Sequence, residues 1–180
     1  AQRKAEEGAV MVILTDRHIT QDSLPIPAAM AVGAVQQRLV NNNLRCDTNI
    51  IIETASARDP HHFAVLLGFG ATAIYPYLAY ESLVAMSDNK VIDKSYREVT
   101  LSYRNAINKG LFKIMSKMGI STISSYRCSM LFEAVGLSDK VVELCFKGVA
   151  SRIAGACFED FEHDQGKLRK LAFSARKLLS

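Results

Sequence analysis

The sequence has none of the features that would direct it into a membrane or out of the cell. No apolar run approaches the roughly 20 residues needed to cross a bilayer, and the start, AQRKAEEGA, does not have the basic-then-apolar order of a secretory signal. The four cysteines (Cys46, Cys128, Cys145 and Cys157) are far apart and form no C-x-x-C pair. We therefore expect free thiols, a cytoplasmic location and no membrane partner.

Several catalytic and nucleic-acid signatures are also missing. The sequence contains no G-x-S-x-G, no Walker loop and no paired-carboxylate arrangement. The net charge is only +4, and the basic residues are spread along the chain. A nucleic-acid partner is therefore not expected.

What remains is an ordinary globular composition. The 180 residues are 49% hydrophobic and 22% charged, enough for one domain with a sizeable core. No linker or low-complexity segment divides them. The first residue is not Met, and residues 2–9 have the pattern of a helix already under way, so we expect a fragment of a longer protein.

Residues 49–83 predict a strand, a loop, a helix, a strand and a helix. Residues 49–54 are β-branched and apolar, as in a buried parallel strand. Asp59 and Pro60 begin a helix that Gly68 and Gly70 end. Residues 71–77 form the second strand, and two strands joined through a helix form the βαβ unit of an α/β protein.

The other elements extend this pattern. We expect a strand at 10–14, a helix at 28–40, a long helix at 96–118, an extended or strand segment at 121–127, a short helix at 130–135, and helices at 139–146 and 158–179. This order resembles half of a (β/α) barrel: parallel strands with helices, plus C-terminal helices. Residues 1–157 would form the α/β unit and residues 158–180 a C-terminal helix.

Two places could carry chemistry. Thr15, Asp16 and Arg17 form a polar loop at the C-terminal end of a strand, where sites in parallel sheets usually lie. The second is Glu53 with Arg58, His61 and His62, which could perform acid–base work or bind a metal.

The metal interpretation of the second group is weak. Adjacent helical residues point about 100° apart, so His61 and His62 cannot easily share one ion, and their spacing is not H-E-x-x-H. Alternatively, one histidine caps or packs and the other faces a neighbouring domain. The G-x-G-x-x-A match at residues 68–73 follows a helix and precedes a strand, so a tight turn explains it better than a nucleotide loop.

Polar and basic residues suggest surfaces between domains. Residues 124–127 are polar where a buried strand would be apolar, so they either line an interdomain surface or form an exposed loop. Lys109, Lys113 and Lys117 share one helix face, which is either solvated or meets an acidic patch on an adjoining domain. The residues that we expect on an interdomain surface are Arg58, His61, His62, Ser125, Tyr126 and Arg127.

Three segments carry a family resemblance: ETASARDPHHFAVLLGFGATAIYPYLAYESL at 53–83, KGLFKIMSKMGISTISSYR at 109–127 and FEAVGL at 132–137. Together they resemble the central region of the glutamate synthase large subunit. The resemblance implies a parent that transfers the amide nitrogen of glutamine to 2-oxoglutarate, with amidotransferase and FMN-binding domains on either side and possibly a small NADPH-oxidising subunit. The central region would wall the ammonia passage as a scaffold, with no catalytic residues of its own.

The resemblance also places the cofactors elsewhere. The family's amidotransferase nucleophile is an N-terminal Cys, whereas this chain begins with Ala1, and the trio of cysteines for an iron–sulfur cluster is missing. In the family's FMN barrel, Gly-rich strand-end loops hold the phosphate. Here the matching loops are residues 53–55 and 75–77, where Pro76 removes a donor and tyrosines crowd the rest.

We therefore expect no FMN, metal or other cofactor on this chain, and a C-terminal helix that leads toward the FMN domain. The competing hypothesis is a free-standing barrel-like enzyme or small-molecule binder that uses Glu53, Arg58, His61 and His62.

Overall fold

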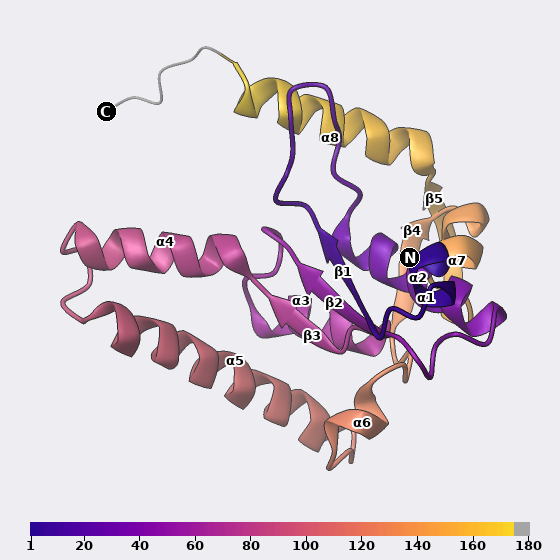
Figure 1. Ribbon diagram of the computed structural model, residues 1–180, viewed down its shortest axis with the longest axis horizontal. Coiled ribbons are helices and arrows are strands. Elements are labelled where there is room, and N and C mark those ends of the chain that lie inside the picture. Colours follow the sequence, from indigo (N-terminus) through magenta and orange to yellow (C-terminus); the bar gives the residue numbers. More distant parts are fainter. Residues whose placement is uncertain (175–180) are drawn as a thin grey trace.

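The computed structural model describes residues 1–174, which form two small parallel sheets with helices packed around them (Figure 1). The elements in order are α1 (Gln2–Glu6), β1 (Met11–Thr15), α2 (Ala28–Asn41), β2 (Asn49–Glu53), α3 (Pro60–Gly68), β3 (Ala73–Tyr75), α4 (Tyr77–Asp88), α5 (Tyr96–Lys117), α6 (Ile123–Tyr126), β4 (Glu133–Leu137), α7 (Asp139–Cys145), β5 (Ala150–Ala156) and α8 (Phe158–Ala172).

The first sheet has the order β1-β2-β3 and all its strands are parallel. Ile13 pairs with Ile51, and Ile52 pairs with Ile74, so the C-terminal ends of the three strands lie at one edge. The unit predicted at 49–83 is confirmed, with α3 as the crossover from β2 to β3. The fold class is also confirmed: it is α/β with parallel strands, and the strands of residues 1–174 do not close into a barrel.

Helix α3 begins where the sequence predicts. The Asp59 carboxylate accepts hydrogen bonds from the backbone N–H groups of His61 (2.9 Å) and His62 (3.1 Å), and Pro60 occupies the first helical position. Gly70, with φ +113°, makes the turn toward β3. The G-x-G-x-x-A match is therefore a helix-to-strand turn.

The main core lies between the sheet and helices α2, α3 and α7. Phe69 joins these elements, since its ring stacks on Phe132 (centroids 5.4 Å apart) and meets the edge of Phe146 (4.8 Å). Fully burying a side chain of this size stabilises the fold by about 1.5–3 kcal/mol. Helix α2 comes close to α7 at Gly33, where a Cβ would overlap the backbone carbonyl of Cys145.

The second sheet corrects one prediction. Residues 130–135 were expected to form a short helix, but residues Glu133–Leu137 form strand β4, which pairs in parallel with β5 through an irregular register. The helix prediction is wrong because the backbone of this segment forms strand hydrogen bonds with β5. Strand β5 was not predicted. Its residues, ASRIAGA, are small and largely exposed, and give only a weak strand signal.

The extended segment expected at 121–127 is also wrong. Residues Ile123–Tyr126 form the short helix α6, because none of the strands described within residues 1–174 pairs with them. One helical turn buries Tyr126 completely against Ala64, Leu67 and Met115. Of the C-terminal helix predicted at 158–179, Phe158–Ala172 is confirmed, and residues 175–179 lie outside the described residues.

The long helix predicted at 96–118 is confirmed as α5 (Tyr96–Lys117), and its buried residues are Val99, Ile107 and Met115. It packs against α3 and α4. Helices α4 and α5 form a hairpin that extends well beyond the sheet, away from the second sheet and α8 (Figure 1). Loop 16–27, between β1 and α2, projects on another side and reaches α8 (Figure 1).

Candidate functional site

Polar side chains gather at the C-terminal ends of the first sheet. We call this group the strand-end cluster. It consists of Thr15, Asp16, Arg17, Glu53, Thr54, Tyr77 and Glu81, from β1, β2, α4 and the loops that follow the strands. The parallel register brings the cluster together, because Thr15 and Glu53 are register partners.

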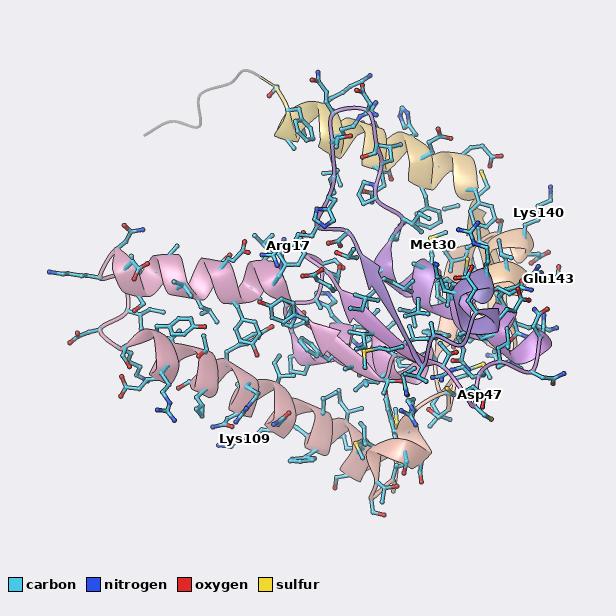
Figure 2. The ribbon with its side chains drawn as sticks, viewed as in Figure 1. Arg17, Met30, Asp47, Lys109, Lys140 and Glu143 are labelled. Atoms are coloured by element: carbon cyan, nitrogen blue, oxygen red, sulfur yellow. The ribbon has the colours of Figure 1, made fainter. Side chains whose placement is uncertain are left out.

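Arg17 is the central cation of the cluster. Its Nη1 lies 3.0 Å from Oε1 of Glu53, its Nη2 donates to Glu81, and its guanidinium lies 4.7 Å from the centre of the Tyr77 ring. Figure 2 shows Arg17 between the sheet and the start of α4. The hydrogen bond to Glu53 raises the pKa of Arg17 above its ordinary value, and both carboxylates add to this effect. The cation therefore stays charged and tied to two anions.

Glu53 is held ionised. Its Oε2 accepts a hydrogen bond from the Thr15 hydroxyl at 2.8 Å. This bond, together with the bond and charge of Arg17, lowers the pKa of the Glu53 carboxyl. Glu53 is thus a hydrogen-bond acceptor at neutral pH and not a proton donor.

The Asp16 carboxylate binds hydrogen-bond donors of the loop that follows β2. Its carboxylate accepts hydrogen bonds from the Thr54 hydroxyl (2.5 Å) and from the Ala55 backbone N–H (3.1 Å). Thr54 is completely buried. Burial, with the nearby Asp16 carboxylate adding, raises the pKa of Tyr77 to about 12, so Tyr77 stays neutral beside it.

The backbone donors that follow β2 are already bonded and so are not free to cradle a flavin phosphate. Such a cradle needs several backbone N–H groups free to point at the anion. Here the N–H of Ala55 bonds to Asp16, that of Ser56 to the Thr54 hydroxyl (3.2 Å) and that of Thr54 to the carbonyl of Tyr75 (3.1 Å). Pro76 has no N–H to offer.

Two clefts lie on either side of residues 24–27. The first, of about 440 Å³, opens beside Thr15, Asp16 and Glu53 and is otherwise lined mainly by apolar side chains of β1 and loop 16–27. The second, of about 560 Å³, is apolar and lies between α2, α7 and α8. Both are open to solvent at the surface of this chain.

The predicted group of Glu53, Arg58, His61 and His62 is not drawn into one site. Glu53 bonds to Thr15 and Arg17, as described above. His62 Nδ1 instead accepts from the backbone N–H groups of Arg58 (3.1 Å) and Asp59 (3.4 Å), and the bond from Asp59 completes the cap of α3. The expectation that one histidine caps is confirmed. Among residues 1–174, no group of three or more His, Cys, Asp or Glu side chains could hold a metal ion.

The residues expected on an interdomain surface divide into two kinds. Arg58, His61, His62 and Ser125 are exposed, and Arg127 is half-buried. Tyr126 does not lie on the surface of this chain, since it is fully buried, and its hydroxyl has no hydrogen-bond partner among residues 1–174. Whether the exposed members meet another domain stays a prediction.

The cysteines are free thiols. Cys145 is buried in the core, and burial raises the pKa of its thiol. Cys46 is exposed, and Cys128 and Cys157 are half-buried. None of the helices within residues 1–174 is long and apolar enough to cross a membrane.

Sequence reasoning found part of the strand-end cluster. It identified the polar loop at Thr15–Arg17 as a place for a site, and Glu53 as a candidate. It did not predict that Tyr77 and Glu81 contact Arg17. The Arg17–Glu81 pair spans 64 positions of sequence, and no local pattern indicates such a contact.

Comparison with known proteins tests the family resemblance independently of the structure. The chain is 37% identical over 190 residues to the glutamate synthase [NADH] of Saccharomyces cerevisiae, with 100% of the chain and 9% of that protein covered. It is 39% identical to the glutamate synthase [NADPH] large chain of Bacillus subtilis (96% and 11% covered). It is 38% identical to the ferredoxin-dependent glutamate synthase of Pyropia yezoensis (95% and 12% covered).

The chain thus spans only about a tenth of the length of these relatives. The family model described as "Glutamate synthase central domain" matches residues 1–138, which include the first sheet, the α4–α5 hairpin and the strand-end cluster. The chain belongs to the glutamate synthase central domain family.

Proposed function

We propose that this chain is a non-catalytic central segment of a glutamate synthase. In this role it holds the neighbouring catalytic domains and couples glutamine hydrolysis to the reductive formation of glutamate from 2-oxoglutarate. The observation that carries the proposal is the internal pairing of the strand-end cluster. Arg17 is bound to Glu53 and Glu81, and Asp16 is bound to Thr54 and Ala55.

Internal pairing is the opposite of what an active site needs. A catalytic acid, base or nucleophile must reach the reacting atom of a substrate, often with a pKa moved toward the working pH. Here the pKa of Glu53 is lowered and that of Arg17 is raised, so both shifts hold each group in its charged form. The cluster therefore holds β1, β2 and α4 in a fixed position relative to one another.

The open edges of the first sheet support a place inside a larger assembly. Strand β1 has a partner on one side only, and its side chains Met11 and Ile13 are 53% and 58% exposed. An apolar edge strand left in water invites pairing with other chains, so natural proteins normally cover it. Flanking amidotransferase and FMN-binding domains of the same polypeptide would provide that cover.

The proposal places the cofactors outside this chain. The parent would use FMN and an iron–sulfur cluster in its flanking domains, and possibly a small subunit that oxidises NADPH. The donors that Asp16 and Thr54 occupy at the strand ends support a flavin site elsewhere. Residues 1–157 would form the central unit, and α8 would lead toward the FMN domain.

The test uses the whole parent glutamate synthase carrying Arg17→Gln, which breaks the pairs with Glu53 and Glu81. We expect glutaminase activity and ammonia-dependent glutamate synthesis each to stay within about twofold. Glutamine-dependent synthesis should fall about tenfold, a change of about 1.4 kcal/mol in coupling. Glu81→Gln should act in the same direction.

The matched control is Arg3→Gln, which also removes one arginine from an ion pair. That pair, with Glu7, is on the surface of α1, where the Arg3 side chain is 85% exposed. We expect all three activities to be unchanged. Loss of one half-reaction alone in Arg17→Gln would contradict the proposal, because it would give the cluster a direct chemical role.

A further inference from the structure

A second polar feature lies away from the strand-end cluster, in the α4–α5 hairpin. A cleft of about 260 Å³ between the two helices is lined by three tyrosines and two arginines, with Thr100 between them. We call it the Tyr–Arg cleft; its residues are Tyr75, Tyr80, Tyr96, Arg97, Thr100 and Arg104. Its lining comes from the end of β3 and from α4 and α5, the two helices of the hairpin (Figure 1).

The aromatic wall of this cleft is ordered by its own contacts. The Tyr80 ring stacks on Tyr75 (centroids 6.0 Å apart) and meets the edge of Tyr103 (5.5 Å). The Tyr103 hydroxyl in turn donates to the carbonyl of Arg58 at 2.9 Å, which fixes that ring at the start of α3. Tyr96, on the opposite wall, is 61% exposed.

The positive charges of the two arginines are not balanced by ion pairs within residues 1–174. Arg97 and Arg104 are seven residues apart on α5, so they lie on one face about 10.5 Å apart along the axis. Within residues 1–174 neither guanidinium forms an ion pair with a carboxylate. Glu98, next to Arg97 in the sequence, accepts from Ser95 at 2.9 Å, and within the described part of the chain Asp93, four positions before Arg97, forms no ion pair with it.

We propose that the Tyr–Arg cleft docks an acidic polypeptide segment. Carboxylates of this segment pair with Arg97 and Arg104, and its apolar atoms lie on the exposed tyrosine rings. Tyrosine and arginine, together with tryptophan, are enriched at the energetic centres of protein interfaces. A small ligand is a poorer fit, since ligand pockets usually have 300–1,000 Å³ and bury most of the ligand, whereas this cleft is smaller and its arginines are exposed.

Charge complementarity identifies the partner. Two guanidiniums with no internal counter-ion offer bidentate sites for two carboxylates spaced by about 10 Å. This spacing corresponds to two acidic side chains seven residues apart on one face of a helix. Residues three apart on an extended strand span a similar distance but point to opposite faces. Tyr75 borders both the cleft and the strand-end cluster, but Arg97 and Arg104 lie on α5 and take part in none of the pairs of that cluster. Failure of the docking site would therefore leave the proposed function untouched.

The experiment places a photo-cross-linking amino acid at Leu101, a 37% exposed residue at the cleft, in the parent glutamate synthase. We expect a cross-linked peptide that carries at least two Asp or Glu residues. The double charge reversal Arg97→Glu with Arg104→Glu should reduce the cross-link at least tenfold. Raising the salt from about 0.05 to 0.5 M should weaken it as well, because exposed ion pairs are screened.

The matched control reverses two charges elsewhere on the same helix. Lys109 and Lys113 are exposed, and Figure 2 shows Lys109 on the side of α5 away from α4. Lys109→Glu with Lys113→Glu should leave the cross-link within about twofold. Equal thermal melting of the two double variants excludes misfolding. If they melt differently, the single variants Arg97→Gln and Arg104→Gln are compared, and each should reduce the cross-link.

Three results would overturn the proposal. The first is no cross-link from the position of Leu101, and the second is a cross-linked peptide without acidic residues. The third is a cross-link that survives the arginine reversals in a folded protein.

Discussion

The Asp16 carboxylate lies 3.1 Å from the backbone N–H of Ala55, across the ends of two neighbouring parallel strands. Backbone N–H groups at such strand ends commonly bind the anionic part of a ligand. In this protein an anion from the chain itself takes that place. Since Asp16 also accepts from the buried Thr54 hydroxyl, one side chain satisfies two donors of the loop that follows β2.

Removing this carboxylate should destabilise the fold. In Asp16→Ala the hydroxyl of Thr54 and the N–H of Ala55 lose their acceptor, and a lost charged hydrogen bond costs about 1.5–3 kcal/mol. We expect the free energy of unfolding, measured by urea denaturation, to fall by about 2 kcal/mol. Asp22→Ala, in the exposed part of loop 16–27, is the control and should change it by less than about 0.5 kcal/mol. Equal losses in both variants would contradict the structural role of Asp16.

The sequence predicts the first sheet well because its signals are local. The β-branched run at 49–53, the cap at Asp59 and Pro60, and the glycine turn before β3 each lie within a few residues of the backbone they control. Hydrophobic periodicity likewise identifies α5. Of the strand-end cluster, the sequence predicts the polar loop at residues 15–17 and Glu53 as candidates, but not the contacts that join them.

The second sheet could not be predicted in the same way. Strand β4 is short, and its backbone becomes a strand only because β5, about 17 residues later, pairs with it. The register is irregular, and a Cβ at Gly155 would overlap the carbonyl of Gly136. Close approach of two backbones through a glycine leaves no periodic pattern in the sequence.

The cap of α3 should make stability depend on pH. Hydrogen bonds from the backbone of His62 and His61, and the nearby imidazoles, lower the pKa of Asp59 below its ordinary value of 3.8. A lowered folded-state pKa stabilises the fold above the unfolded-state pKa, and this stability is lost as the pH falls through the folded-state pKa. We therefore expect Asp59 to contribute fully near pH 7 and to lose its contribution progressively below about pH 5.

Two variants distinguish the capping hydrogen bonds of Asp59 from the charge of its carboxylate. Asp59→Asn keeps a good cap, so urea denaturation at pH 7 should show little change while the acid dependence becomes flatter. Asp59→Ala removes the cap and should cost about 1 kcal/mol at pH 7. An acid dependence that is the same in Asp59→Asn and in the unchanged chain would rule out this role of the carboxylate.

The Tyr126 hydroxyl is buried, and no group in the described part of the chain forms a hydrogen bond with it. Leaving a hydroxyl unpaired in the core costs about 1–3 kcal/mol, while its ring fills the space between α3, α5 and α6. We expect Tyr126→Phe to unfold at equal or higher urea concentration, with a gain of up to about 1 kcal/mol. Tyr126→Leu should lose about 1–3 kcal/mol through the cavity that it leaves. A clear loss in Tyr126→Phe would show that the hydroxyl has a partner, such as an ordered water or a neighbouring domain.

Gly33 decides how closely α2 and α7 can pack. A Cβ there would overlap the carbonyl oxygen of Cys145, which is backbone and cannot rotate away, so the helices must separate. We expect Gly33→Ala to cost about 3 kcal/mol and to lower the melting temperature by roughly 6–12 °C for a domain of this size. Gly166, in the middle of α8, is the matched control because a Cβ there meets nothing within 4 Å. Gly166→Ala should instead gain about 0.5–1 kcal/mol from helix propensity alone. If both variants gained stability in thermal melting, the close contact of α2 with α7 would be wrong, and with it the packing that holds the second sheet against the first.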